Sequence, residues 1–101
     1  MPVGAEARTD PAIWHEFRFW RAGVEHALTG GLWLHRHTWR GVRMAHLVSS
    51  DLARLEWVGL TIGLHPARLQ YRPLRDPRSG TRTPAWHWDL VGPWVPPESS
   101  R

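Results

Sequence analysis

Trp86-His87-Trp88-Asp89-Leu90 alternates between large apolar and polar side chains. In a β-strand, successive side chains point to opposite faces of the sheet. We therefore expect the two tryptophans and Leu90 to enter the core, with His87 and Asp89 together on the other face. A rise of about 3.3 Å per residue places the imidazole and the carboxylate roughly 7 Å apart. Such a pair suits a metal ion, a catalytic base or a polar ligand, and it names no reaction by itself.

The composition bounds the class of protein. The chain has 101 residues, eight of them tryptophan, and it contains no cysteine. This length suits one domain with a single modest core, and the lack of cysteine excludes disulfides, thiolate ligands and a cysteine nucleophile. No apolar run approaches the roughly 20 residues of a membrane span, and the N-terminus lacks a signal-peptide pattern. We therefore predict a cytoplasmic protein that is not bound to a membrane.

The spacing of apolar residues predicts an α+β fold, with a small three-stranded sheet covered by one helix and an extra N-terminal helix. We expect strands over residues 32–39, 42–49 and 85–91, and helices over residues 11–28 and 51–62. The domain should span residues 10–95, between a flexible N-terminus (1–9) and a flexible tail (96–101).

Local signals set the expected ends of the helices. Asp10-Pro11 combines a capping residue with proline at the first helical position, so it predicts the start of the N-terminal helix. Ser50 is the expected cap of the second helix, and Gly63 its stop. A further helical turn is predicted over residues 66–71. The N-terminal helix should pack against the sheet or against a second copy of the protein.

Four polar residues are the candidate catalytic set: His46, Gln70, His87 and Asp89. They come from one predicted strand (His46), the end of a predicted helical segment (Gln70) and a second strand (His87 and Asp89), so only the fold can bring the three elements together. Three interpretations stay open. The set is a buried hydrogen-bond network, a metal or catalytic site, or a pocket for a ligand that carries phosphate.

A second pair of histidines extends the candidate metal ligands. His35 and His37 alternate on a predicted strand, which points both rings to one side, a geometry that sites for zinc and other divalent metals use. A third ligand would have to be His46, His87 or Asp89. The cofactor that this set would suit is a divalent metal ion, zinc or manganese/magnesium; the alternative is a chain without a cofactor. With seven histidines in the chain, such a pair also arises by chance.

Several residues between Leu32 and Leu90 fit one family pattern: Arg43-Met44, His46-Leu47, Leu52, Leu55, Ile62-Gly63-Leu64, Leu69-Gln70 and His87-Trp88-Asp89-Leu90. With them the chain resembles a family of small bacterial and phage proteins known only as a domain of unknown function. The resemblance implies a fold and a shared polar set, without an established activity.

The chain departs from the family pattern at several places. His35 and Ser50 stand where the family tends to have aspartate, and Trp88 stands where it usually has tyrosine. Aspartate also binds divalent metals, so His35 fits a metal role, whereas Ser50 fits a structural cap. The family's C-terminal helix is missing here, and the N-terminal helix is additional.

An arginine-rich loop is predicted over residues 72–85. The loop contains four arginines and a single acidic residue, Asp76. The arginines are Arg72, Arg75, Arg78 and Arg82. Beside exposed aromatic side chains, such a loop suits the phosphates of a nucleic acid, although a solvated surface loop has the same composition. The formal net charge of +4 favours anionic partners without requiring them.

Two hypotheses about function follow. The first is a metal-dependent hydrolase that acts on a phosphodiester or a nucleotide, with the His/Asp set activating water. The alternative is a non-catalytic module that binds nucleic acid or protein through the arginine loop and the tryptophan surface.

Overall fold

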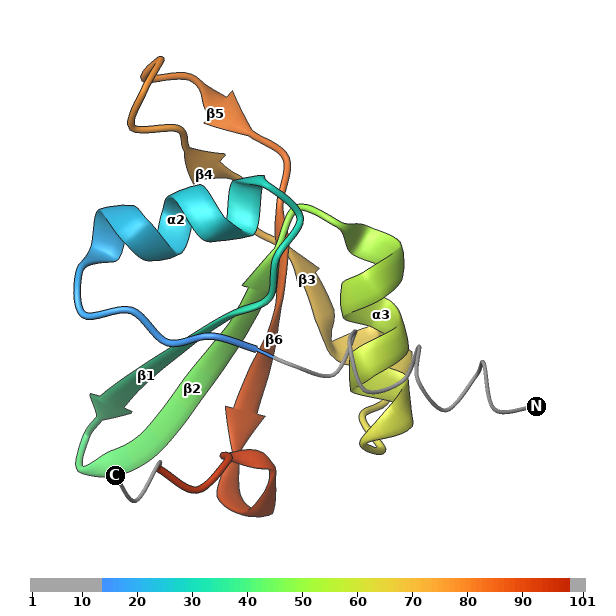
Figure 1. The fold of residues 1–101 in the computed structure, drawn as a ribbon. Helices are drawn as coiled ribbons and strands as arrows, with labels where there is room; N and C mark the ends of the chain where they lie inside the picture. The colour runs from blue at the N-terminus through green and yellow to red at the C-terminus, as the bar shows by residue number, and fades with distance from the viewer. Residues whose placement is uncertain (1–13, 99–101) are drawn as a thin grey trace.

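The computed structural model describes residues 14–98, which form a mixed α+β fold (Figure 1). The larger sheet has four strands in the order β1-β2-β6-β3, and its pairs are antiparallel. A separate two-stranded hairpin joins β4 to β5. In chain order the elements are α2 (Trp20–Leu28), β1 (Trp33–Trp39), β2 (Val42–Ser49), α3 (Leu52–Thr61), the 3-10 turn η1 (Pro66–Arg68), β3 (Leu69–Tyr71), β4 (Leu74–Arg75), β5 (Arg82–Thr83), β6 (Trp86–Val91) and the 3-10 turn η2 (Gly92–Trp94).

The three predicted strands are confirmed, but the three-stranded sheet is wrong because the sheet has a fourth strand, β3. The predicted helical turn over residues 66–71 is right only for Pro66–Arg68. Leu69–Tyr71 instead pairs with β6, and this places Gln70 directly opposite His87. A three-residue strand is too short to show an alternating pattern, and its stability comes from pairing the free backbone edge of β6.

The N-terminal helix is shorter than predicted. It begins at Trp20, and the described residues before it are not helical. His15 forms a parallel bridge with Trp33: the N–H of His15 donates to the carbonyl of Leu32, and the N–H of Leu34 donates to the carbonyl of His15. The edge of β1 thus offers these residues hydrogen bonds that compete with the helix. The predicted start at Asp10-Pro11 lies outside the described residues.

The two helices lie on opposite sides of the four-stranded sheet (Figure 1). The α3 side holds the main core, in which Trp88 and Leu90 are buried as predicted and Trp86 is partly buried. Trp88 packs so closely on Gly59 that a Cβ there would lie 2.0 Å from its ring, which explains this glycine inside a helix. The indole N–H of Trp88 donates to the carbonyl of Leu55 at 2.8 Å.

The cap of α3 differs from the prediction by one residue. Asp51 is the N-cap, and its carboxylate accepts a hydrogen bond from the N–H of Arg54 at 3.1 Å. The hydroxyl of Ser50 donates instead to the carbonyl of Ala27, the last buried residue of α2. Ser50 therefore ties α2 to the end of β2, a role that only the packing of α2 on the sheet creates.

On the opposite side, α2 covers only one end of the sheet. Val24 and Ala27 pack there on Trp33 and Val48. The remaining length of this face extends along β1, β2 and β6 beyond the helix, and it carries the polar residues described below.

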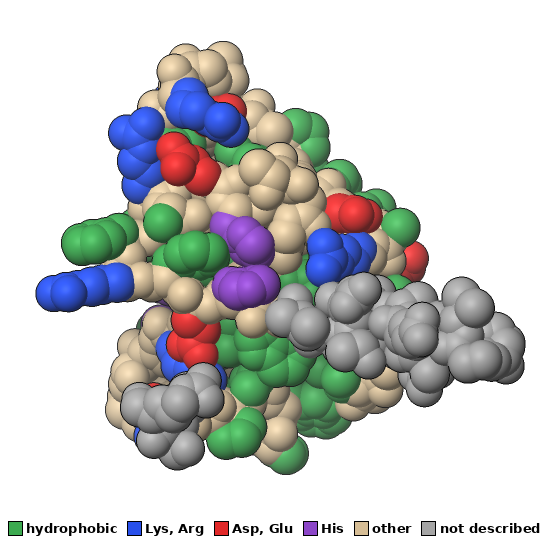
Figure 2. Space-filling view, in the orientation of Figure 1, with side chains coloured by type: hydrophobic (Ala, Val, Ile, Leu, Met, Phe, Trp, Pro, Cys, Tyr) green, Lys and Arg blue, Asp and Glu red, His purple; other side chains and the backbone are tan. Residues whose placement is uncertain are grey.

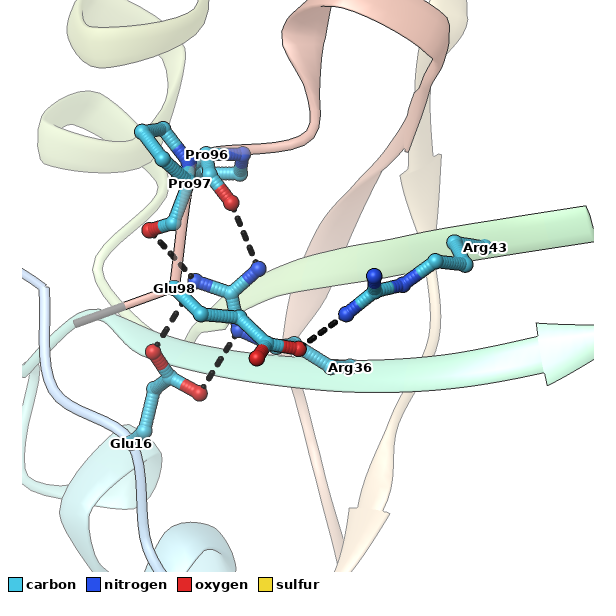
Figure 3. A network of polar contacts seen from close by, with 6 residues as sticks. All are labelled: Glu16, Arg36, Arg43, Pro96, Pro97 and Glu98. Carbon is cyan, nitrogen blue, oxygen red and sulfur yellow. Dashed lines mark hydrogen bonds and ion pairs between the residues drawn. The ribbon is translucent and has the colours of Figure 1, made fainter. Parts of the chain in front are cut away.

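Arg36 joins the two ends of the described chain (Figure 3). Its guanidinium binds both carboxylate oxygens of Glu16, at 2.8 and 3.1 Å, and also donates to the carbonyls of Pro96 and Pro97. Glu98 pairs with Arg43. Residues 96–98, the described part of the predicted tail, thus contact the strands, while the predicted flexible N-terminus, residues 1–9, lies outside the described part. No helix between residues 14 and 98 is long and apolar enough to cross a membrane.

Candidate metal centre

Strand register gathers the predicted polar residues on one face of the sheet. His35 on β1 lies opposite His46 on β2, and His46 in turn lies opposite Asp89 on β6. Directly opposite residues of antiparallel strands point to the same face, so these three side chains form a row across the sheet. Gln70 and His87 form the neighbouring pair.

Asp89 is the centre of the first group of contacts. Its Oδ1 lies 2.9 Å from Nε2 of His46 and 3.3 Å from Nε2 of His87. The two imidazole rings stack at 4.5 Å between centroids with an angle of 9°. His87 Nε2 also lies 2.8 Å from Oε1 of Gln70. All four residues of the predicted catalytic set are therefore in contact, and Gln70 positions the ring of His87.

His35 and His37 extend the cluster along β1. The ring centroid of His37 lies 4.4 Å from that of His46 and 6.0 Å from that of His35. Two groups of three residues have ligand atoms that lie within 4.8 Å of one another inside each group. The first group is His35, His37 and His46, and the second is His46, His87 and Asp89, so His46 belongs to both. All five predicted metal ligands thus lie in one continuous cluster.

One buried nitrogen of this cluster has no hydrogen-bond partner among the described residues. This atom is Nδ1 of His37. A buried polar group without a partner costs about 1–3 kcal/mol of stability. Native structures rarely keep such a group unless it serves a ligand, a water molecule or an ion.

The electrostatics favour neutral imidazoles. Burial, together with the neighbouring His87 and against the opposing charge of Asp89, lowers the pKa of His46 to about 4. Burial is also the main cause that lowers the pKa of His35 and of His87. At neutral pH these rings are therefore uncharged, the form in which histidine binds metal ions.

Two residues outside the predicted set border the cluster. Trp20 stands edge-on to His35, with 4.9 Å between ring centroids, and its side chain is mostly exposed. It is the first residue of α2, and no sequence signal marked it as a neighbour of the histidines. Arg72 continues the line of β3 through a hydrogen bond to the carbonyl of Ala85, and its charge lowers the pKa of His87.

Two clefts lie at the end of the sheet that carries Arg36 and Arg43. One of about 460 Å³ is formed by β1, β2 and the C-terminal segment around Arg36 and Arg43, and none of the five candidate ligands lines it. A smaller cleft of about 140 Å³ reaches His37 from the same end. The candidate centre is therefore a half-exposed patch on the sheet rather than a deep pocket.

The arginine-rich loop contains the β4–β5 hairpin. Within it Arg75 donates to the carbonyl of Gly80 at 2.7 Å, and Arg78 lies 3.5 Å from the carboxylate of Asp76. These two arginines therefore contact the hairpin itself. On the face shown in Figure 2, arginine side chains lie in separate groups with acidic or uncharged side chains between them.

No family model, curated protein or solved structure matches this chain. The resemblance of residues 32–90 to small bacterial and phage proteins stays a prediction, and the function must be argued from the cluster alone.

Proposed function

We propose that this protein is a metal-dependent hydrolase whose metal ion is bound by His46, His87 and Asp89. The observation that carries the proposal is the convergence of two imidazole nitrogens on one carboxylate oxygen, at 2.9 and 3.3 Å. Ligands held about 2.0–2.1 Å from a tetrahedral zinc ion lie roughly 3.3–3.4 Å from one another. A small outward movement of the three side chains would therefore accommodate the ion.

The kind of ligand favours zinc. Imidazole nitrogen suits zinc and other late transition metals, whereas magnesium prefers a shell of oxygen ligands and water. Binding requires a lone pair on Nε2 of each ring, so in the tautomer that binds metal the ring proton of His87 lies on Nδ1. In that tautomer Nε2 of His87 has no proton to donate to Oε1 of Gln70, so their 2.8 Å contact belongs to the metal-free protein and metal binding would replace it.

The number of ligands favours catalysis over a purely structural role. Structural zinc sites are closed by four protein ligands, whereas catalytic sites use three and keep a position for water. Here the side chains of His46 and Asp89 are 29% and 36% exposed, so solvent reaches the remaining position. When bound, the metal supplies a water of lowered pKa as the nucleophile.

The surrounding charge favours an anionic substrate. Arg72 acts electrostatically on His87, and the chain has a net charge of +4. A guanidinium beside the metal would hold one oxygen of a phosphate group. A phosphodiester or a nucleotide is therefore the substrate class we propose.

Metal titration tests the proposal. Protein purified without a histidine tag and stripped with a chelator should bind Zn²⁺ or Co²⁺ in calorimetry, and His46→Ala should weaken this binding at least 100-fold. His65→Asn is the matched control, since it removes a histidine outside the cluster and keeps a side chain that caps η1. The metal-loaded protein should hydrolyse bis(p-nitrophenyl) phosphate. Absence of metal binding, or binding that His46→Ala leaves unchanged, would refute the metal centre. Binding without hydrolysis would refute the catalytic role.

A further inference from the structure

We propose that His35 and His37 form a second metal subsite that shares His46 with the first, so that the centre binds two metal ions. This inference rests on the proposed function, because the first subsite supplies the shared ligand. It adds an ion that the His46/His87/Asp89 group alone does not require.

The geometry of β1 and β2 carries the inference. His35 and His37 alternate on β1, and His46 lies directly opposite His35 on β2. The ligand atoms of these three residues lie within 4.8 Å of one another, as do those of His46, His87 and Asp89. The imidazoles of His35 and His37 therefore lie on the β1 side of His46, separate from the carboxylate of Asp89 on its β6 side.

The unsatisfied nitrogen of His37 is an independent observation. Its Nδ1 is buried and lacks a hydrogen-bond partner within residues 14–98. A bound ion could relieve this cost directly, through Nδ1, or by fixing the ring in an orientation that satisfies it. The first subsite leaves this atom unexplained, because it does not use His37.

One histidine serves both ions through its two ring nitrogens. Nε2 of His46 faces Asp89, so Nδ1 is the atom that remains for the second ion. A ring that binds a metal at both nitrogens is an imidazolate, and its proton passes to solvent. The two ions would then lie on opposite edges of the same ring, one beside Asp89 and the other beside His37.

Stoichiometry tests the inference. The stripped wild-type protein should bind two Cu²⁺ or two Zn²⁺ ions per chain, measured by calorimetry and by elemental analysis after desalting. The double variant His35→Ala/His37→Ala should bind one ion, and the control His65→Asn should still bind two. With Cu²⁺, magnetic coupling through the imidazolate should reduce the wild-type electron paramagnetic resonance signal below that of two isolated ions, and the double variant should give the full signal of one.

The outcomes separate this inference from the proposed function. One ion in the wild-type protein overturns the second subsite and leaves the first in place, and this result depends on no variant. Two ions that the double variant also retains would overturn the placement at His35 and His37. Failure to bind any ion would overturn both proposals. Circular dichroism checks that each variant is folded, and His37→Gln, which keeps a polar side chain of similar size, should also reduce the stoichiometry to one.

Discussion

Replacing Asp89 with asparagine separates a metal centre from a hydrogen-bond network. The change keeps the size of the side chain and removes its charge. In the metal-free protein Asp89 accepts contacts from His46 and His87 at 2.9 and 3.3 Å. If the cluster binds a metal ion, Asp89 is also its only anionic ligand in this group. The two roles predict different magnitudes for affinity and for stability.

The expected magnitudes follow from these contacts. Removing even an outer partner of a metal ligand costs about 10–100-fold in affinity. Loss of a charged ligand should therefore weaken metal binding by at least about 100-fold, which corresponds to roughly 2.7 kcal/mol. In the metal-free protein the asparagine oxygen still accepts a hydrogen bond, so Asp89→Asn should lower the unfolding free energy by no more than about 1–3 kcal/mol.

Two measurements check this prediction. Titration with Co²⁺, followed by visible absorbance, gives the affinity, and urea unfolding in the presence of a chelator gives the stability. Glu56→Gln is the matched control, because it removes one negative charge from the exposed surface of α3. Equal Co²⁺ affinities for Asp89→Asn and the wild-type protein would refute a role for Asp89 as ligand. A loss of stability with no metal binding in either protein would favour the hydrogen-bond network.

Further predictions concern stability and nucleic acid. Gly59→Ala should lower the unfolding free energy by about 1–3 kcal/mol in urea, because the new Cβ overlaps the buried ring of Trp88; an unchanged midpoint would contradict this packing. In the presence of a chelator, the unfolding free energy should fall as the pH drops from about 6.5 toward 4. In this range His46 is protonated in the unfolded chain but still neutral in the folded protein, where its pKa is about 4. His46→Ala should flatten this pH dependence. If the arginine hairpin binds duplex DNA, the logarithm of the binding constant should fall linearly with the logarithm of the salt concentration, with a slope of about 0.9 per phosphate contact. Replacing all four arginines of the loop by glutamine should flatten that slope by about three to four units. These residues are Arg72, Arg75, Arg78 and Arg82. No binding at about 50 mM salt would reject this alternative function.

The sequence was most informative where the structure is periodic. Alternation along β6 predicted both the burial of Trp88 and the shared face of His87 and Asp89, because side-chain direction in a strand depends only on the parity of the residue number. The same rule placed His35 and His37 together. Helical spacing predicted the wrong structure at β3, which is three residues long, and at residues 14–19, where His15 pairs with the edge of β1 instead.

Sequence alone thus determined which residues are available for a site: the histidines, the carboxylate and the strands that carry them. Only the tertiary structure decided that these residues meet, because the register of β1, β2 and β6 aligns His35, His46 and Asp89 in one row. The lowered pKa of His46 and the unpartnered nitrogen of His37 have the same origin. Both arise from burial and from neighbours distant in the chain, and local sequence carries no record of either.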